Sequence, residues 1–169
     1  MAGMSSRFTN AGYTTLKFRL SYKENLNLFQ GSLLSFKNYF NTDEFCFIYL
    51  KDFVEQHEIK SWCNEIGLSE TRINIVELNE STKGQADTVY RGLRKLDTLY
   101  TRQIYIFNID TIYHEFQKPN DNYKNFLDVS KMSGNQWSFA LSDPKNSSFA
   151  IKITEKKRIS NLCSVGLYG

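Results

Sequence analysis

Three short apolar segments alternate along the chain with segments of helical periodicity, and this alternation constrains the fold more than any other feature. The apolar segments are FCFIYL at 45–50, INIVEL at 73–78 and QIYIF at 103–107. The segments between and before them repeat apolar residues every three or four positions: Phe29, Leu33, Phe36 and Phe40; Ile59, Trp62, Cys63 and Ile66; Ala86, Val89, Tyr90 and Leu93. Such spacing is typical of one face of a helix. The order is therefore helix, strand, helix, strand, helix, strand.

Strands that alternate with helices of this length need crossover connections, which make neighbouring strands parallel. We therefore expect an α/β fold with a mostly parallel, Rossmann-like sheet and helices on both faces, in three layers. Asp52 is expected to cap the second helix, and Gly67 suits the left-handed residue at which a helix stops.

The pattern changes after Asp110. Two turn-rich segments, 119–122 and 142–148, separate runs that alternate like strands, WSFAL at 137–141 and FAIKI at 149–153. This predicts a mixed or antiparallel C-terminal part. No repeat or linker divides the chain, so we expect a single domain over residues 1–169.

The composition limits the class of protein. With 169 residues, 41% hydrophobic and 15% aromatic, the chain can bury one core. Its three cysteines form no CxxC pair, which favours neither a zinc site nor a disulfide framework and fits a cytoplasmic location. The net charge of +3 supports small anionic ligands better than nucleic acid, and no apolar run is long enough to span a membrane.

Candidate functional residues follow from the rule that ligands bind beyond the carboxyl ends of parallel strands. Asp110, after the third strand, could hold Mg²⁺ or simply cap a helix. Gly84 and Gln85 open the third helix, where they could approach a flat base or serve as turn residues.

Two further segments also have two interpretations. The residues Ala2, Gly3, Met4, Ser5, Ser6 and Arg7 form a small-residue turn that ends in a guanidinium. Such a turn can bind phosphate or belong to a polar chain end. The run that includes Glu155 and Lys156 could bind an anionic substrate or be a solvated turn.

Together these segments resemble the sugar-phosphate nucleotidyltransferase family. MAGMSSRF followed by AGYTTLKF is similar to the family's loop ending in Ser/Thr-Arg-Phe and its later lysine. TKGQADTV is similar to the family's base-contacting segment, and FNID is similar to the end of the strand that carries its metal-binding aspartate. ITEKKRISNLCSVGLY is similar to the family's Glu-Lys stretch and the strand that follows it beside the sugar. The resemblance lies in five motifs in the family's order.

The resemblance implies a role for each matching residue. Arg7 and Lys17 would be catalytic, and Ala2 to Arg7 would hold the nucleoside triphosphate. Glu77, Gly84 and Gln85 would border the nucleotide, Asp110 would bind Mg²⁺, and Glu155, Lys156 and Gly166 would contact the sugar phosphate. The implied reaction is in-line attack of a sugar 1-phosphate on the α-phosphorus, with release of pyrophosphate and formation of an NDP-sugar for capsule or surface polysaccharide.

The sequence departs from the family pattern at Leu16, at Glu77, which lies near where the family often has a base-reading amide, and at both ends. Leu16 replaces the proline that usually precedes the lysine, which removes a φ restraint at Lys17. The family's first strand and second metal-binding aspartate have no counterpart, so the resemblance implies a chain incomplete at both ends. A catalytically incomplete binding module and a cytidylyltransferase acting on a non-sugar phosphate therefore stay open. The expected partners are an NTP and a sugar phosphate, with neither nucleic acid nor membrane, and a homo-oligomer is compatible.

Overall fold

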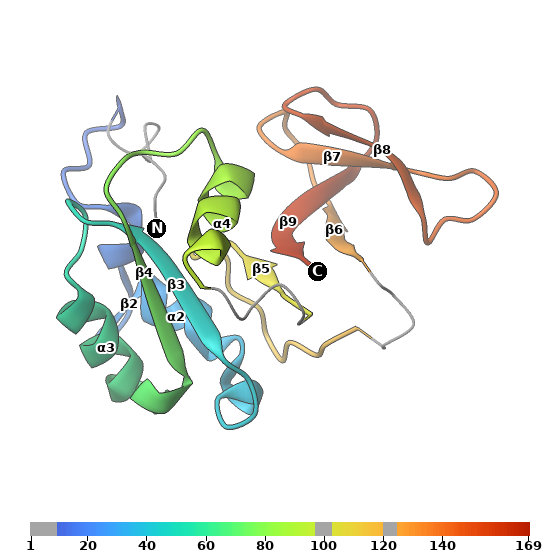
Figure 1. Cartoon of the computed structure of the whole chain (residues 1–169). Coiled ribbons are helices and arrows are strands. Elements are labelled where there is room, and N and C mark those ends of the chain that lie inside the picture. Colours follow the sequence, from blue (N-terminus) through green and yellow to red (C-terminus); the bar gives the residue numbers. More distant parts are fainter. Residues whose placement is uncertain (1–9, 97–102, 120–124) are drawn as a thin grey trace. The chain divides into compact units, whose positions relative to one another are not determined.

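The computed structural model describes residues 10–96, 103–119 and 125–169 (Figure 1). The chain divides into two compact units. Unit 1 comprises Met1–Arg102 and Ile112–Lys118, and unit 2 comprises Gln103–Thr111 and Pro119–Gly169. The single-domain organisation stays a prediction. None of the helices in the described ranges is long and apolar enough to cross a membrane.

Unit 1 is built on two parallel strands, β3 (Phe45–Leu50) and β4 (Ile73–Leu78), whose bounds are those predicted from the sequence. They pair in register from Phe45 opposite Ile73 to Leu50 opposite Leu78. A short antiparallel hairpin precedes them. The other elements of the unit are η1 (Lys17–Arg19), β1 (Ser21–Lys23), β2 (Leu26–Asn27), α2 (Leu28–Leu34), η2 (Lys37–Tyr39), α3 (Gln56–Glu65), η3 (Glu70–Arg72) and α4 (Gln85–Arg94).

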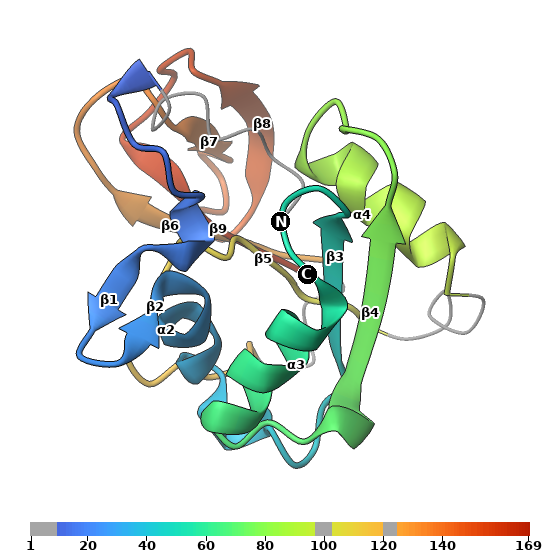
Figure 2. The same cartoon turned by 90° about the vertical axis from the view of Figure 1, so that its left-hand side faces the viewer.

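Helices cover both faces of this parallel pair. On one face Phe47 packs against Phe29 of α2, with ring centroids 5.2 Å apart, and Phe29 in turn packs against Trp62 of α3 at 5.5 Å. On the other face α4 contacts both strands. Figures 1 and 2 show α3 and α4 on opposite sides of the two strands. The α/β prediction is therefore confirmed for this unit, and the complete three-layer, Rossmann-like arrangement stays a prediction.

The second helix begins later than the sequence suggested. Glu55 caps α3 and forms a capping box with Glu58, whose carboxylate accepts from the Glu55 backbone N–H at 3.0 Å. The cap predicted at Asp52 is therefore wrong, because the reciprocal Glu55–Glu58 pair satisfies the first turn instead. The predicted stop is confirmed, since Gly67 follows the helix with φ +86°.

The third helix presents a different face from the one expected. Gly92 is buried, and a Cβ at this position would collide with the side chain of Ile48. This close approach rotates Tyr90 outward, where it is 59% exposed and lies 5.7 Å from the Arg94 guanidinium. The prediction that Tyr90 lies on the apolar face is wrong, because a glycine contact sets the orientation of α4.

Unit 2 is an antiparallel sheet with the order β5-β9-β7-β8, and β6 also pairs with β9. It confirms the predicted antiparallel C-terminal part. The buried side chains of Phe139 and Leu167 lie in its interior. The strands are β5 (Ile106–Phe107), β6 (Leu127–Lys131), β7 (Ser138–Ser142), β8 (Ala150–Glu155) and β9 (Leu162–Tyr168).

The strand expected at 103–107 differs from its prediction in length and in direction. Only Ile106 and Phe107 form β5, and they pair antiparallel with Tyr168 and Leu167 of β9. The Asn108 N–H donates to the Gly166 carbonyl at 2.9 Å, which extends the same ladder. The expected parallel pairing of this strand is therefore wrong, because its backbone bonds to β9.

Candidate functional site

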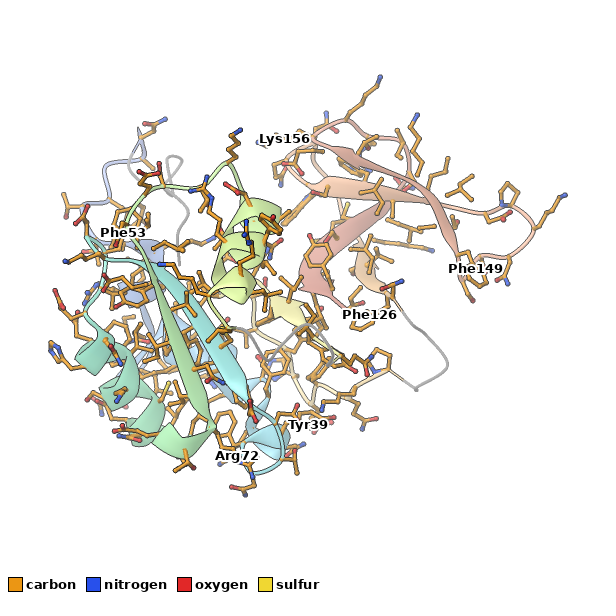
Figure 3. The ribbon with its side chains drawn as sticks, in the orientation of Figure 1. Tyr39, Phe53, Arg72, Phe126, Phe149 and Lys156 are labelled. Atoms are coloured by element: carbon orange, nitrogen blue, oxygen red, sulfur yellow. The ribbon has the colours of Figure 1, made fainter. Side chains whose placement is uncertain are left out.

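The carboxyl ends of β3 and β4 form one edge in unit 1, where a parallel sheet usually presents its ligands. The loops after both strands start there, held by a hydrogen bond from the Lys51 N–H to the Leu78 carbonyl at 3.2 Å. Phe53, in the loop after β3, packs against the buried cluster that contains Leu50, Val76 and Leu78. Figure 3 places Phe53 at this end of the unit and Arg72 at the opposite end.

Lys17 is held near the loop after β3 by its neighbour in η1. The Arg19 guanidinium donates to the Phe53 carbonyl at 3.1 Å and to both carboxylate oxygens of Glu58, at 2.7 and 2.9 Å. This bidentate bond lowers the pKa of Glu58 to about 2 and raises that of Arg19. The ion pair therefore fixes the backbone that carries Lys17, the predicted catalytic cation, beside the carboxyl edge.

Glu77 lies one residue before the end of β4, with its carboxylate bonded to the neighbouring strand. The buried Tyr49 hydroxyl donates to Glu77 Oε2 at 2.8 Å. Burial of the Tyr49 ring and this bond raise the pKa of Tyr49 to about 12. Lys95 Nζ also donates to the Glu77 carbonyl at 2.6 Å. The carboxylate predicted to contact the nucleotide is thus held in position by the protein's own side chains.

Gly84 and Gln85 open α4, as the sequence predicted. Gly84 has φ 154°, a conformation that side chains with a Cβ rarely adopt, and a Cβ there would meet no atom within 4 Å. Asp87 accepts from the Lys83 N–H at 2.9 Å and from Arg91 Nε at 2.9 Å, and these contacts lower the pKa of Asp87. The turn into α4 is thus built by a backbone conformation and an acid in the first helical turn.

Asp110 and Gly166 are brought together in unit 2. The exposed Asp110 lies in a turn closed by a hydrogen bond from the Thr111 N–H to the Asn108 carbonyl at 3.2 Å. Thr111 Oγ1 bonds to the Val165 carbonyl, and the Asn108 side chain occupies the space that a Cβ of Gly166 would need. The glycine therefore allows the turn that carries Asp110 to lie directly on β9.

Glu155 and Lys156 lie at the end of β8, on the other side of β7 from β9. Glu155 accepts a hydrogen bond from Ser138, and the Lys156 N–H donates to the Trp137 carbonyl at 2.9 Å. The Lys156 ammonium lies 3.5 Å from the Glu155 carboxylate, and both side chains are more than 60% exposed. Such an exposed pair contributes little stability, which leaves both groups accessible to an anionic or hydroxylated ligand.

Arg158, the third cation of the same run, has a structural role. Arg158 donates to the carbonyls of Met132, Gly134 and Ser160, and its guanidinium lies 4.8 Å from the centroid of Phe139. It therefore anchors the loop between β6 and β7. The different roles of Arg158 and Lys156 could not be predicted from the sequence, because they depend on how the strands pair.

The described residues contain no group of three acidic, histidine or cysteine side chains that could hold a metal ion. Mg²⁺ in nucleotide sites is usually held by one or two carboxylates and by substrate phosphates. The exposed Asp110 carboxylate fits that mode of binding. Ala2 to Arg7 lie outside the described residues, so the predicted triphosphate loop stays a prediction.

Two residues near these positions were not predicted from the sequence to belong to the site. Tyr49 holds Glu77 across the parallel strands, and Asn108 fills the space beside Gly166. Both relations depend on the register between strands. The strand bounds of β3 and β4 were available from the sequence and would have placed Tyr49 opposite Glu77 once an in-register parallel pair was assumed. No comparable signal marked Asn108.

No protein-family model matches the chain, and neither does any curated protein. Among solved structures, the chain is similar to the nucleoside-diphosphate-sugar pyrophosphorylase from Vibrio cholerae RC9, with 36% sequence identity and a TM-score of 0.85. The similarity covers 99% of this chain and 70% of the Vibrio chain. The chain therefore belongs to the nucleoside-diphosphate-sugar pyrophosphorylase family.

Proposed function

We propose that the protein transfers a nucleoside monophosphate from an NTP to a sugar 1-phosphate, with release of pyrophosphate. The observation that carries this proposal is the similarity to a nucleoside-diphosphate-sugar pyrophosphorylase over nearly the whole chain. We further propose that the NDP-sugar serves capsule or surface polysaccharide synthesis in the cytoplasm. The complete domain would have the three-layer, Rossmann-like arrangement.

The roles of the residues follow from their chemistry and position. Lys17 would neutralise charge at the reacting phosphate, and its backbone is held by the Arg19–Glu58 pair. Gly84 would let a flat base approach the start of α4, and Gln85 could donate to it and accept from it. Glu77, held by Tyr49, would accept hydrogen bonds from the nucleotide.

The sugar phosphate would be bound by unit 2. Lys156 would bind its phosphate and Glu155 its hydroxyls, since both side chains are exposed. Gly166 would line the sugar pocket. Asp110 would hold Mg²⁺, which supplies positive charge between the two anionic reactants. In-line transfer needs no covalent protein nucleophile, because the reaction depends on positioning and charge neutralisation.

Pyrophosphate release tests the proposed reaction. The protein is incubated with each NTP, Mg²⁺ and a panel of sugar 1-phosphates, with phosphorylated non-sugar alcohols in parallel. Release with one NTP and one sugar 1-phosphate is expected. Release only with a non-sugar phosphate would replace the sugar in the proposal, and no release from any pair by folded protein would contradict catalysis.

The second candidate is a binding module that has lost catalysis, favoured by the lack, among the described residues, of any group of three acidic, histidine or cysteine side chains that could hold a metal ion. Asp110→Asn separates the two. In an enzyme this variant loses Mg²⁺-dependent turnover, whereas a binding module without turnover keeps its affinity for metal-free nucleotide. Asp143→Asn is the matched control, because Asp143 caps a turn in the same unit through the Lys145 N–H at 2.8 Å, a bond that asparagine can also accept.

A further inference from the structure

The outer strand β8 is exposed in an unusual way for a strand of apolar composition. In the part of the chain that the structure describes, β8 pairs only with β7, which leaves its other edge open. Ile151 and Ile153 are 57% and 59% exposed, and Phe149 just before the strand is 58% exposed. Figure 3 shows Phe149 and Lys156 at the two ends of this strand. An exposed apolar edge of this kind is a template for pairing with another strand.

The backbone groups available on this edge follow from the pairing with β7. The Lys156 N–H bonds to the Trp137 carbonyl, which makes these two residues a hydrogen-bonded pair. Because such pairs alternate along an antiparallel ladder, Thr154 also bonds toward β7, whereas Ile153 and Glu155 direct their N–H and C=O groups outward. The open edge therefore offers donors and acceptors on both sides of Thr154.

We infer that this edge pairs with the same edge of a second copy of the chain, antiparallel and centred on Ile153. In this register Ile153 of each copy bonds to Ile153 of the other, and Lys152 faces the neutral Thr154. Shifting the centre to Lys152 would place two lysines opposite each other, and shifting it to Thr154 would oppose Lys152 to Lys156. Like charges directly opposite destabilise a sheet, so charge disfavours these two registers. A register centred on Ile151 would pair only residues 150–152 of the strand, whereas the one centred on Ile153 pairs residues 151–155.

Charge also favours a second copy over an anionic partner. Within β8 the one lysine and the one glutamate balance each other, so two copies of the strand meet without net repulsion. The contact is small, because each strand has only six residues. Interfaces well below about 1,200 Å² are typically weak and transient. The dimer is therefore a weak one that forms reversibly with concentration.

Sedimentation velocity of the whole chain over a wide concentration range tests this pairing. The wild-type protein is expected to shift reversibly from monomer to dimer. Ile153→Lys places two ammonium groups on the symmetry axis and weakens the dimer about tenfold or more. Ile151→Lys is the matched control, since its exposure is nearly equal and its new charge faces Glu155 of the other copy. This control is expected to keep the dimer.

Three outcomes would overturn the inference. The first is a wild-type protein that stays monomeric at every concentration. The second is equal loss of dimer in both lysine variants, which would indicate a general apolar contact. The third is a monomer that binds anionic phosphatidylglycerol vesicles through β8.

Cross-linking provides a second test that does not depend on the lysine variants folding. In a Cys46→Ser background, which removes the exposed cysteine, Ile153→Cys is expected to form a disulfide between copies on mild oxidation. Ile151→Cys should form much less. Equal cross-linking of both, or none at position 153, would contradict the register.

Discussion

The parallel pair of unit 1 and the outer strand β8 of unit 2 bury their side chains to very different degrees. In unit 1, Tyr49, Leu50 and Leu78 are all less than 7% exposed, because helices cover both faces of their strands. In unit 2, every residue of β8 except Thr154 is exposed. Unit 1 is therefore stabilised mainly by apolar burial, whereas part of unit 2 depends on backbone hydrogen bonds and a few anchoring side chains.

The polar contacts differ in the same way. In unit 1 they join side chains of different elements, such as Arg19 with Glu58 and Tyr49 with Glu77. In unit 2 Ser138 and Glu155 also bond between strands, but Arg158 donates to three backbone carbonyls and the turn at Asn108 fits against a glycine. The comparison predicts that cavities are most damaging in unit 1 and backbone changes in unit 2.

The largest effect is expected for Phe29→Ala. Phe29 is fully buried and packs against Phe47 and Trp62, so its loss leaves a cavity between α2, α3 and β3. A loss of about 3–5 kcal/mol in the free energy of unfolding is expected, measured by urea denaturation. Hydrogen exchange should accelerate mainly in β3 and β4. Equal acceleration in β7 and β9 would contradict the expectation that the cavity destabilises unit 1 more than unit 2.

Gly166→Ala is expected to cost about 2–3 kcal/mol in unit 2. Gly166 has φ +86°, which strains any residue with a Cβ, and the new methyl would collide with Asn108. Gly12→Ala is the matched control, because Gly12 has φ +87° and no atom within 4 Å of a new Cβ. It should cost only about 1 kcal/mol from strain.

The collision can be separated from the strain by a double variant. Asn108→Ala removes the side chain that a methyl at position 166 would meet. In that background Gly166→Ala should cost no more than the Gly12 control. If the cost is unchanged, the turn that carries Asp110 does not depend on the space beside Gly166.

Glu58→Gln is expected to lose about 1.5 kcal/mol at neutral pH, because it removes the charge bonded by Arg19. The pKa of Glu58 is lowered from 4.5 to about 2 by this pairing. The stabilisation is therefore complete above pH 4.5 and is lost as the pH falls through about 2. Thermal melts of the two proteins should converge over that range, with the exposed Glu80→Gln as control. A difference that persists below pH 2 would mean that the glutamate acts through packing.

The sequence predicted the strands of unit 1 better than the arrangement of unit 2. The bounds of β3 and β4 are those of two of the apolar runs in the sequence, because helices cover both faces of these strands. The run at 103–107 is also largely apolar, yet its last two residues pair antiparallel with β9. A local pattern cannot specify a partner that lies some sixty residues away.

The candidate site was predictable where a residue's role is local. Gly84 lies at the N-cap of α4 as expected, because a glycine before a helical pattern marks a turn. The close fit of Asn108 against Gly166 was not predictable, because it depends on the register of β9. Nor was it predictable that Arg158 bonds to backbone carbonyls whereas Lys156, two residues earlier, has an exposed side chain.

Tyr49→Phe is expected to have the smallest effect on stability, about 1 kcal/mol, since it removes one hydroxyl hydrogen bond and leaves the ring in place. Loss of the hydroxyl frees the Glu77 carboxylate to adopt other rotamers. If Glu77 contacts the nucleotide, the KM for NTP rises while kcat changes little, and Tyr22→Phe in the same unit changes neither. Alkaline titration provides an independent measure, because the phenol with a pKa of about 12 should be missing from the variant. A changed stability with an unchanged KM would mean that the Tyr49–Glu77 bond only stabilises the fold, as the Arg19–Glu58 pair of unit 1 does.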